Sequence, residues 1–434
     1  MKIGIIGAGI TGLAIGYKLS KIGYNVTIFE KSANLGGLIG SIKFSNTYLE
    51  KYYHHIFTTH QEIVDLINKV GLGSDLIWSQ TKMGFYYNKK IYPFTTPKDL
   101  ILFKPLKLLD RLRMGISSLL FLSLKNWKTL DNLVAIDFLQ KYSGKKACDV
   151  IWQPLLKGKF GSEYNNISAV WLWDRIKSRR GFTKNRGLKE YLGYLKGGFY
   201  KLLQKLANEI KLHGGEVLLN SPVESIVVEN NVARGLILNK EFYGFSKIIV
   251  TLPIPNFIQI CKKLPSDYVN LLTRIKYMSS LGVMLILKRS LSPYYWININ
   301  DPRIPFIAII EHTNLISPAE YNDNNIVYLI KYLLNEDPFL TLPDEVIIKI
   351  YTKYLKQIFP EYSDNWLTNC NVFRDRYTQP VFSKNYSKNL PAHKTPIRNL
   401  ILANTSQFYP ESRCMNTSVR LAERIKDLIE MGKL

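Results

Sequence analysis

The chain has 434 residues, 46% of them hydrophobic and 12% aromatic, which is enough to bury the cores of two domains. Its four cysteines lie far apart and form no C-x-x-C pair, so the sequence argues against a disulfide framework or a zinc site and favours the reducing cytoplasm. The 58 basic and 34 acidic residues leave a net charge of +24. The basic residues are scattered and accompany no nucleic-acid motif, so we expect no nucleic-acid partner.

The amino-terminal segment has the pattern of a dinucleotide-binding unit. It predicts a strand over Lys2–Ile6, a glycine turn, a helix to about Lys21 and a second strand over Val26–Phe29. Glu30 ends the second strand, where an acid accepts hydrogen bonds from an adenosine ribose and repels a ribose 2′-phosphate. We therefore predict a βαβ unit that binds a dinucleotide.

Each glycine of the turn has its own predicted role. Gly7 permits the sharp turn out of the strand, Gly9 lets the backbone approach a pyrophosphate, and Gly12 allows the helix to pack closely on the sheet. The helix begins inside the turn. The unpaired N–H groups of its first residues, Ile10 and Thr11, and the positive end of its dipole therefore face the phosphates.

Further along, the hydrophobic pattern alternates between helices and strands. We expect helices over 61–70 and 343–358, and a largely helical region over 98–156 with breaks near Pro105 and Gly144. A last helix opens at Cys414. The expected strands are 83–87 and 91–94, joined as a hairpin, followed by 281–288, 306–311, 326–332 and 370–376.

Aromatic and histidine side chains after the glycine turn are candidates for the reacting end of the site. Two adjacent histidines on a strand point to opposite faces, so we expect only one of His54 and His55 to enter a cavity, as a proton acceptor or through ring packing. Tyr53, Tyr295 and Trp296 are candidates for a wall against the substrate, with core packing as the alternative. No third ligand accompanies the histidines, so we expect no metal.

Two basic segments are candidates for contact with an anion. Residues 175–189 carry seven basic residues, which would bind an anionic substrate or lipid, or would form a solvated helix face. Residues 101–127 mix Leu, Phe and Ile with basic residues and would lie on a membrane, line a tunnel to a lipid-like substrate, or pack in the core. No segment has the roughly 20 uninterrupted apolar residues that span a bilayer. We therefore expect a cytoplasmic protein, with peripheral contact to an anionic membrane as an open alternative.

Three segments stand out together: residues 30–41 with the pair Gly36-Gly37, residues 197–226 with the pair Gly197-Gly198, and residues 399–405 with 414–420. They resemble segments of the superfamily of FAD-dependent amine oxidases and protoporphyrinogen oxidases. The stretch from Glu30 to Ser41, which contains the pair Gly36-Gly37, is similar to the family's extended dinucleotide motif. Residues 197–226 are similar to its middle FAD segment, and 399–405 together with 414–420 to its closing segment. The chain differs from the family in having Ala403-Asn404 in place of Gly-Asp or Gly-Thr/Glu, and Thr417 in place of glycine.

The resemblance implies that FAD is the cofactor. In the family the paired glycines bring the chain along the diphosphate, and the backbone of the residue matching Val223 contacts adenine. The last helix begins at the flavin ring, which Met415 and Asn416 would approach through their backbone. The full set expected to bind FAD is Gly7, Gly9, Ile10, Thr11, Gly12, Glu30, Lys31, Gly36, Gly37, Val223, Asn404, Met415 and Asn416.

The resemblance also implies an architecture. We predict an α/β fold with a Rossmann-type FAD-binding domain, doubly wound and mainly parallel, over residues 1–75, 194–255 and 396–434. Residues 76–193 and 256–395 would form a discontinuous α+β substrate domain.

In this family a hydride passes from a substrate C–H bond to flavin N5, and a lysine sometimes holds a water molecule near N5. Lys276, which lies just before an apolar strand, is the candidate for that lysine. We therefore predict an FAD-dependent oxidoreductase that acts on a hydrophobic, anionic or lipid-like small molecule. The alternative is an isomerase resembling UDP-galactopyranose mutase, which shares the nucleotide domain but has no net redox change. A non-catalytic protein that binds flavin or nucleic acid is a third hypothesis.

Overall fold

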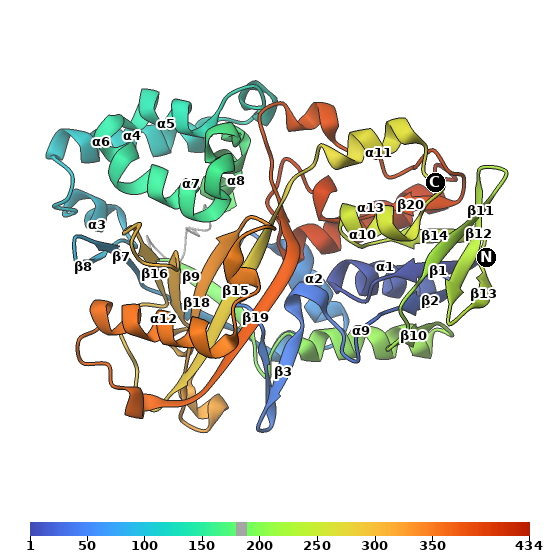
Figure 1. The fold of residues 1–434 in the computed structure, drawn as a ribbon, viewed down its shortest axis with the longest axis horizontal. Helices are drawn as coiled ribbons and strands as arrows, with labels where there is room; N and C mark the ends of the chain where they lie inside the picture. Colours follow the sequence, from blue (N-terminus) through green and yellow to red (C-terminus); the bar gives the residue numbers. More distant parts are fainter. Residues whose placement is uncertain (179–188) are drawn as a thin grey trace.

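The computed structural model describes residues 1–178 and 189–434, which form two parts that lie side by side (Figure 1). The part that holds both termini is built on a five-stranded parallel sheet with the order β10-β2-β1-β14-β20. Its strands are β1 (Lys2–Ile6), β2 (Asn25–Phe29), β10 (Glu216–Leu218), β14 (Lys247–Val250) and β20 (Leu400–Leu402). The predicted mixed α/β fold with a parallel sheet is confirmed.

The two faces of this sheet are covered differently. On one face α1 (Ile10–Lys21) packs between α9 (Tyr200–Leu212) and α13 (Met415–Glu430). On the other face lies a three-stranded antiparallel sheet of β11 (Ser225–Glu229), β12 (Val232–Leu238) and β13 (Glu241–Gly244).

The neighbouring residues Gly4 and Ile5 of β1 point to opposite faces of the sheet and contact these different covers. Ile5 faces α1, whereas a Cβ on Gly4 would lie 2.9 Å from the Phe245 ring. A doubly wound sheet would carry helices on both faces, so the structure differs from the prediction at this point.

The second part is built on a seven-stranded sheet with the order β19-β15-β18-β17-β16-β7-β8, antiparallel except for the β16–β7 pair. All eleven residues of β15 are buried. Its odd-numbered residues from Leu281 to Leu287 pack in one core with Ile347, Tyr351 and Leu355 of the helix α12 (Asp344–Ile358). The strands are β7 (Met83–Tyr87), β8 (Lys90–Pro93), β15 (Tyr277–Leu287), β16 (Trp296–Ile299), β17 (Ala308–Glu311), β18 (Asn325–Leu333) and β19 (Leu367–Pro380).

Helices form a block at the outer end of this second part. They are α3 (Pro97–Ile101), α4 (Leu108–Ser123), α5 (Ala135–Ser143), α6 (Lys145–Ala147), α7 (Gln153–Phe160) and α8 (Ala169–Ser178). The predicted break at Gly144 is confirmed, because this residue ends α5 with a φ of +89°, a conformation that favours glycine. The predicted break near Pro105 falls between α3 and α4 and is also confirmed.

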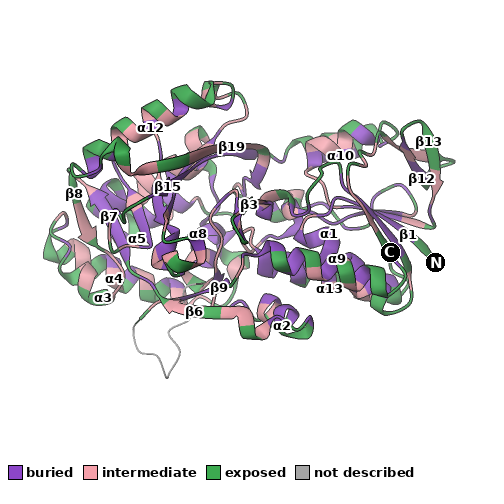
Figure 2. Ribbon diagram, turned by 90° about the horizontal axis from the view of Figure 1, so that it is seen from below, coloured by how far each residue is buried: buried purple, intermediate pink, exposed green. Residues whose placement is uncertain are grey.

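Shorter elements connect the two parts. They are β3 (Ser41–Phe44), β4 (Thr47–Glu50), β5 (Ile56–Phe57), α2 (Gln61–Lys69), β6 (Leu76–Gln80), β9 (Tyr191–Leu195), α10 (Ile254–Ile260) and α11 (Ser266–Thr273). The helices α10 and α11 lie beside the five-stranded sheet, although α10 spans the boundary predicted at residue 255 and α11 follows it (Figure 1). Buried residues concentrate in both sheets and along the helix faces that cover them (Figure 2).

Candidate active site

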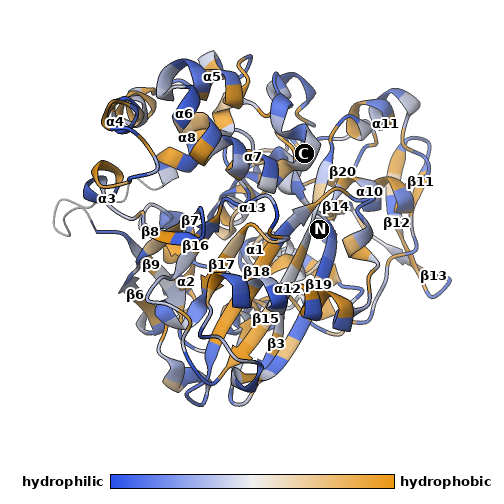
Figure 3. Ribbon diagram, turned by 60° about the vertical axis from the view of Figure 1, so that its left-hand side comes forward, coloured by the Kyte–Doolittle hydropathy of each residue, from blue (hydrophilic) through white to orange (hydrophobic). Residues whose placement is uncertain are grey.

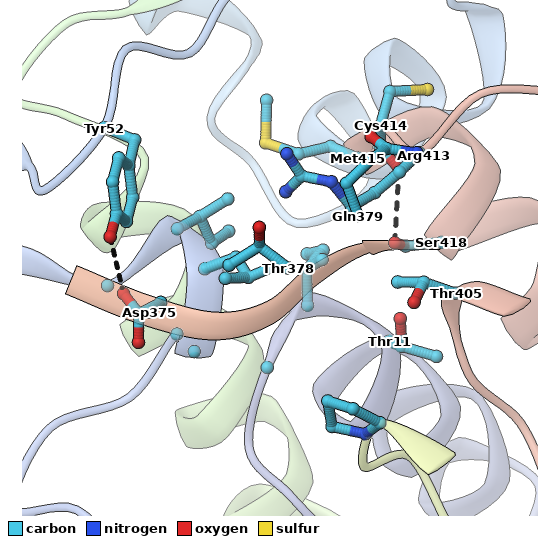
Figure 4. A pocket seen from close by; sticks show the side chains of 18 of the residues that line it. Thr11, Tyr52, Asp375, Thr378, Gln379, Thr405, Arg413, Cys414, Met415 and Ser418 are labelled. Carbon is cyan, nitrogen blue, oxygen red and sulfur yellow. Dashed lines mark hydrogen bonds between the residues drawn. The ribbon is translucent and has the colours of Figure 1, made fainter. Parts of the chain in front are cut away.

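A cavity of about 1000 Å³ extends from the carboxyl ends of β1 and β2 to the second sheet. This is the edge of a parallel sheet where ligands bind in open α/β folds, and the volume is at the upper end for a small-molecule site. Figure 4 shows side chains from the start of α1, from β19 and from the start of α13 around one space, with Thr11, Thr378 and Met415 among those labelled.

The glycine turn has the geometry that its sequence predicts. Gly7 adopts a φ of +104°, and a Cβ on Gly12 would lie only 2.0 Å from the Gly7 carbonyl oxygen, so the chain itself excludes a side chain there. Gly9 is different, because the nearest heavy atom to its Cβ would be the Gly36 oxygen at 3.8 Å. Space for a side chain therefore exists at Gly9 within the protein, and that space opens on the cavity.

The pair Gly36-Gly37 lies directly beside this turn. Gly36 has a φ of +119° and Gly37 a φ of +54°, and the Gly36 N–H donates to the Ala8 carbonyl at 3.0 Å. Gly9 and Gly36 form a parallel bridge, and both glycines of the pair line the cavity. Two nearby segments of the chain thus lie side by side and expose their backbone to the cavity.

Glu30 lies at the end of β2 with only 8% of its surface exposed. Its Oε2 accepts a hydrogen bond from the Ala8 N–H at 2.9 Å, and its Oε1 accepts from the Ser32 N–H at 2.9 Å. Lys31 and Val223 line the same end of the cavity, and the Ser221 N–H donates to the Glu30 carbonyl at 2.8 Å. The predicted ribose and adenine positions therefore adjoin each other.

The start of α13 faces the same cavity. Cys414 caps the helix with Thr417, whose hydroxyl accepts from the Cys414 N–H at 3.1 Å, which gives a physical reason for threonine where the family has glycine. Met415 and Asn416 line the cavity. The Asn416 side chain is engaged elsewhere, because its Oδ1 accepts from the Ile63 N–H at 3.0 Å, so its backbone is the part free to meet a ligand.

Asn404 lies apart from the cavity lining. Its side chain is buried in a turn, where Nδ2 donates to the Leu252 carbonyl at 2.7 Å and Oδ1 accepts from the Ser406 N–H at 3.0 Å. The expectation that this amide reaches FAD is therefore corrected: the side chain caps a turn, and the next residue, Thr405, lines the cavity.

These residues fit FAD. The unpaired N–H groups at the start of α1 and α13 supply donors and positive dipole ends for an anionic ligand. The face of Gly9 is also open to the cavity, where the diphosphate would lie. Separately from this cradle, Arg413 lines the same space, and its buried Nε has no hydrogen-bond partner among the described residues. A buried donor without a partner is costly unless a ligand satisfies it.

Both histidines of the aromatic segment line the cavity, so the expectation that only one would do so is wrong. Residues 52–55 lie outside any strand, and the alternation of a strand does not apply to them. The Nδ1 of His54 lies 2.8 Å from the Tyr52 carbonyl, which fixes Nδ1–H as the donor, and burial together with the Arg413 charge lowers the His54 pKa to about 4. The Nδ1 of His55 lies 2.9 Å from the Tyr295 hydroxyl.

The aromatic candidates occupy two layers. The rings of Tyr53 and Trp296 meet edge to face with centroids 4.8 Å apart, and both line the cavity. Tyr295 is buried and is not among the lining residues. Its hydroxyl hydrogen-bonds to His55, which does line the cavity, so Tyr295 would position that ring instead of contacting a ligand.

Lys276 is placed away from the cavity, and its predicted role near flavin is corrected. Its side chain is 64% exposed, and Nζ forms an ion pair with Glu163 at 2.7 Å. The lysine was predicted from its position before an apolar strand, and β15 does begin at the next residue, but the Lys276 side chain lies on the surface instead of in the cavity lining.

The structure also brings in residues that sequence reasoning missed. Opposite Met278–Ser280 of β15, strand β19 holds two extra residues between Asp375 and Gln379, and this bulge places residues 376–378 in the cavity lining. Tyr377 adopts a φ of +59°, an uncommon conformation for a residue with a bulky side chain. A bulge depends on the partner strand, so nothing in the local sequence indicates it.

Two charged side chains were missed in the same way. Asp375 accepts from the Tyr52 hydroxyl at 3.0 Å, and burial raises the Asp375 pKa (Figure 4). Arg413 lies close enough to lower the His54 pKa through its charge. Its position just before the predicted last helix was a signal that could have identified it.

The predicted basic segment reaches the cavity at its beginning. Arg175 and Lys177 of α8 are lining residues, as is Lys159 of α7. The other basic residues of that prediction that precede Lys189, namely Arg179, Arg180, Lys184 and Arg186, lie outside the described residues.

A backbone cradle for a dinucleotide, joined to a basic and aromatic cavity, is the arrangement of an FAD-dependent oxidoreductase. The family model described as flavin containing amine oxidoreductase matches residues 10–424. The chain belongs to this family.

Two curated relatives and one solved structure illustrate the similarity. A coproporphyrinogen III oxidase of Staphylococcus aureus is 24% identical over 100% of this chain and 97% of its own length. A mitochondrial protoporphyrinogen oxidase of Nicotiana tabacum is 26% identical over 38% of this chain and 34% of its own length. The crystal structure of a reduced UDP-galactopyranose mutase aligns with a TM-score of 0.77 and 16% identity, covering 100% of this chain and 96% of the mutase chain, which shows a shared fold.

Proposed function

We propose that the chain is an oxidase of the porphyrinogen type, which takes a hydride from a hydrophobic, anionic small molecule. The observation that carries this proposal is the cavity end beyond the glycine turn, where the aromatic walls of Tyr53 and Trp296 lie in one lining with Arg175, Lys177 and Arg413. Porphyrinogens combine a broad apolar ring with carboxylate groups and would match both features. The full-length similarity to a coproporphyrinogen III oxidase supports this substrate class.

FAD would be held by Gly7, Gly9, Ile10, Thr11, Glu30, Lys31, Gly36, Gly37, Val223, Met415 and Asn416, which all line the cavity. Gly12 would contribute through the shape of the turn, because it packs against the Gly7 carbonyl. When bound, FAD supplies the hydride-accepting chemistry. The residue segments 1–75, 194–255 and 396–434 would form the Rossmann-type domain that binds it, with α10 and α11 beside that domain. The segments 76–193 and 256–395 would form most of the substrate domain.

The chain's own side chains would bind the substrate, orient it and exclude water. The Nδ1–H of His54 donates to the Tyr52 carbonyl, which leaves Nε2 as the acceptor of a ring that lines the cavity. The low pKa of His54 keeps the ring neutral at pH 7, so it would act as a hydrogen-bond acceptor and as a weak base. Arg413 stays positively charged and would hold a substrate carboxylate.

The proposed activity is tested by the visible flavin absorbance of the purified protein. Anaerobic addition of coproporphyrinogen III or protoporphyrinogen, each in a separate experiment, is expected to bleach the flavin while an oxidised tetrapyrrole accumulates. Unchanged flavin absorbance with both compounds would overturn the substrate class, provided that chemical reduction of the same sample does bleach it.

A Glu30→Ala variant tests the cofactor position separately. Removal of a carboxylate that accepts from backbone N–H groups and adjoins the ribose position is expected to weaken FAD binding about 10- to 100-fold. Glu229→Ala, at an exposed carboxylate of β11 that is not a lining residue, is the matched control. Equal FAD affinity in the two variants would contradict the assignment, and equilibrium dialysis of FAD measures it.

The mutase hypothesis remains the second candidate, because the shared fold extends over the whole chain. It predicts that UDP binds the cavity and that the protein converts a UDP-galactose isomer only after the flavin is reduced. Turnover without net flavin oxidation or reduction would favour it over the oxidase.

A membrane contact belongs to the same proposal. A lipid-like substrate would reach the cavity from a bilayer if the protein lay on its surface. Among the described residues, no helix has both the length and the apolar character needed to cross a bilayer, so such a contact would be peripheral.

A further inference from the structure

The outer face of α3 and α4 carries a ridge of exposed apolar side chains. We call this face the outer ridge, and its residues are Ile101, Leu102, Leu108, Leu109, Leu112, Ile116, Leu119 and Leu120. Leu109 alone has 80% of its surface exposed. The ridge lies at the end of the molecule farthest from the two termini (Figure 1), and Figure 3 shows the hydrophobic colouring of α3 and α4 at that edge.

The apolar side chains of the outer ridge are not required for the packing of α4 in its own domain. The opposite face of α4 already buries Met114, Ser117 and Phe121, which repeat every three or four residues. The Phe121 ring meets Phe138 of α5 at 4.7 Å, and the Ser117 and Ser143 hydroxyl groups are 2.7 Å apart. Core packing therefore accounts for the inner face and leaves the outer ridge without a partner among the described residues.

Basic residues border the outer ridge. Residues 98–128 contain seven lysines and arginines but only two acids, Asp99 and Asp110. Lys104, Lys107 and Lys125 are exposed, and within the described part of the chain no ion pair involves any of the seven. An apolar stripe with a basic border is the pattern of a helix that lies in the interface of an anionic membrane.

A second copy of the chain fits the ridge less well. In a symmetric dimer the same basic border would meet itself, and the net charge of +24 on each copy would add repulsion. An anionic bilayer instead neutralises the border while it covers the apolar stripe.

A second cavity lies directly under the ridge helix. It has a volume of about 290 Å³, and Ser118 and Leu122 of α4 line it together with the apolar side chains of Phe85 and Trp152. Arg175 lines both this cavity and the larger one, so the two adjoin. The ridge is thus placed over a mainly apolar space that leads to the proposed substrate end.

We propose that the outer ridge docks on an anionic lipid membrane, with its leucine and isoleucine side chains among the acyl chains and its lysines at the headgroups. The smaller cavity then faces the membrane side of the molecule and receives the apolar part of the substrate. This proposal rests on the membrane contact proposed above and is independent of the chemistry at the flavin.

The test is sedimentation of the FAD-loaded protein with vesicles, either of phosphatidylcholine alone or with added phosphatidylglycerol. The wild type is expected to bind the anionic vesicles only. A Leu109→Gln/Ile116→Gln/Leu119→Gln variant is expected to bind them about a hundredfold more weakly, because it loses the inserted aliphatic groups. Lys104→Gln/Lys107→Gln is expected to lose about 30-fold, with a weaker dependence on salt.

A Leu212→Gln/Phe242→Gln/Met431→Gln variant is the matched control, because these exposed apolar residues lie on the other part of the molecule. The control should bind as the wild type does, and all variants should keep their flavin and their turnover of substrate in detergent. Wild-type protein that stays in the supernatant with anionic vesicles would overturn the proposal, as would equal losses in the ridge and control variants. A ridge variant that changes from dimer to monomer in light scattering would instead assign the ridge to a second copy.

Discussion

The two ends of the large cavity are built by different means. At the nucleotide end, the contacts come from backbone in two nearby segments, the turn around Gly9 and the pair Gly36-Gly37, which form a bridge to each other. At the substrate end, side chains converge from segments far apart in the chain, with Trp296 and Arg413 as examples. The first end therefore depends on the absence of side chains, and the second on their placement by tertiary packing.

The largest expected effect separates two glycines of the same turn. In Gly12→Ala the new Cβ would lie 2.0 Å from the Gly7 carbonyl oxygen, which is backbone, so we expect the apoprotein itself to lose about 3 kcal/mol of unfolding free energy. In Gly9→Val the new atoms enter the cavity, so we expect apoprotein stability within about 0.5 kcal/mol of the wild type but no FAD binding.

Chemical unfolding of the apoproteins and dialysis against FAD measure these two effects. If Gly9→Val retained FAD at wild-type affinity, the nucleotide end would not be the diphosphate site. If both variants destabilised the apoprotein equally, the distinction between a structural and a ligand-facing glycine would be wrong.

The next effect in size concerns Arg413 at the substrate end. Arg413→Met removes a half-buried charge whose buried Nε has no hydrogen-bond partner among the described residues. We expect the KM for a porphyrinogen to rise about 10- to 100-fold while FAD content stays constant. Arg413→Lys should restore part of the affinity, because it keeps the charge but loses the guanidinium fork. The pKa of His54 should rise in the Met variant, since the Arg413 charge helps to lower it. Loss of FAD in step with the KM change would place Arg413 at the nucleotide end instead.

The sequence was sufficient where a function depends on local backbone. The turn from Gly7 to Gly12, the acid at Glu30 and the start of α13 lie where their spacing predicts, because each motif lies within one strand–turn–helix unit. The antiparallel sheet β11-β12-β13 on the second face of the parallel sheet was missed. The local pattern of a strand does not indicate which other sheet it packs against.

At the substrate end, local pattern was not enough. Lys276 was chosen for its position just before a strand, and β15 does begin at the next residue. The position along the chain does not fix the direction of the side chain, which is exposed and pairs with Glu163. The bulge around Tyr377 arises from the mismatch between β19 and β15, so no single segment contains the information. Asp375 and Arg413 are identified as site residues only by their tertiary contacts. Asp375 accepts from the Tyr52 hydroxyl, and Arg413 lies close enough to His54 to lower its pKa.

The smallest expected effect concerns Glu50 of β4, which is buried and lies next in the chain to the lining residues Lys51 and Tyr52. Its carboxylate accepts from the Tyr194 hydroxyl at 2.7 Å and from the Phe199 N–H at 2.6 Å, and burial raises its pKa from 4.5 to about 7. Between these two pH values the folded chain holds a proton that the unfolded chain has released. The free energy of unfolding should therefore fall as the pH rises from 4.5 to 7, by at most about 1.4 kcal/mol per pH unit from this group.

The low pKa of His54 acts in the opposite direction, because between about pH 4 and 6.5 the unfolded chain holds the proton that folded His54 lacks, and stability rises with pH. A comparison of the wild type with Glu50→Gln cancels the His54 contribution, so the difference between the two stability curves isolates Glu50. We expect Glu50→Gln to start from a lower stability at pH 4.5, because the amide NH₂ group must face one of the two donors, and to recover relative to the wild type as the pH rises to 7. Denaturant titrations across this range measure the difference, with Glu229→Gln as the exposed control. A constant difference would mean that Glu50 keeps its charge, which its two donors would then have to stabilise against burial.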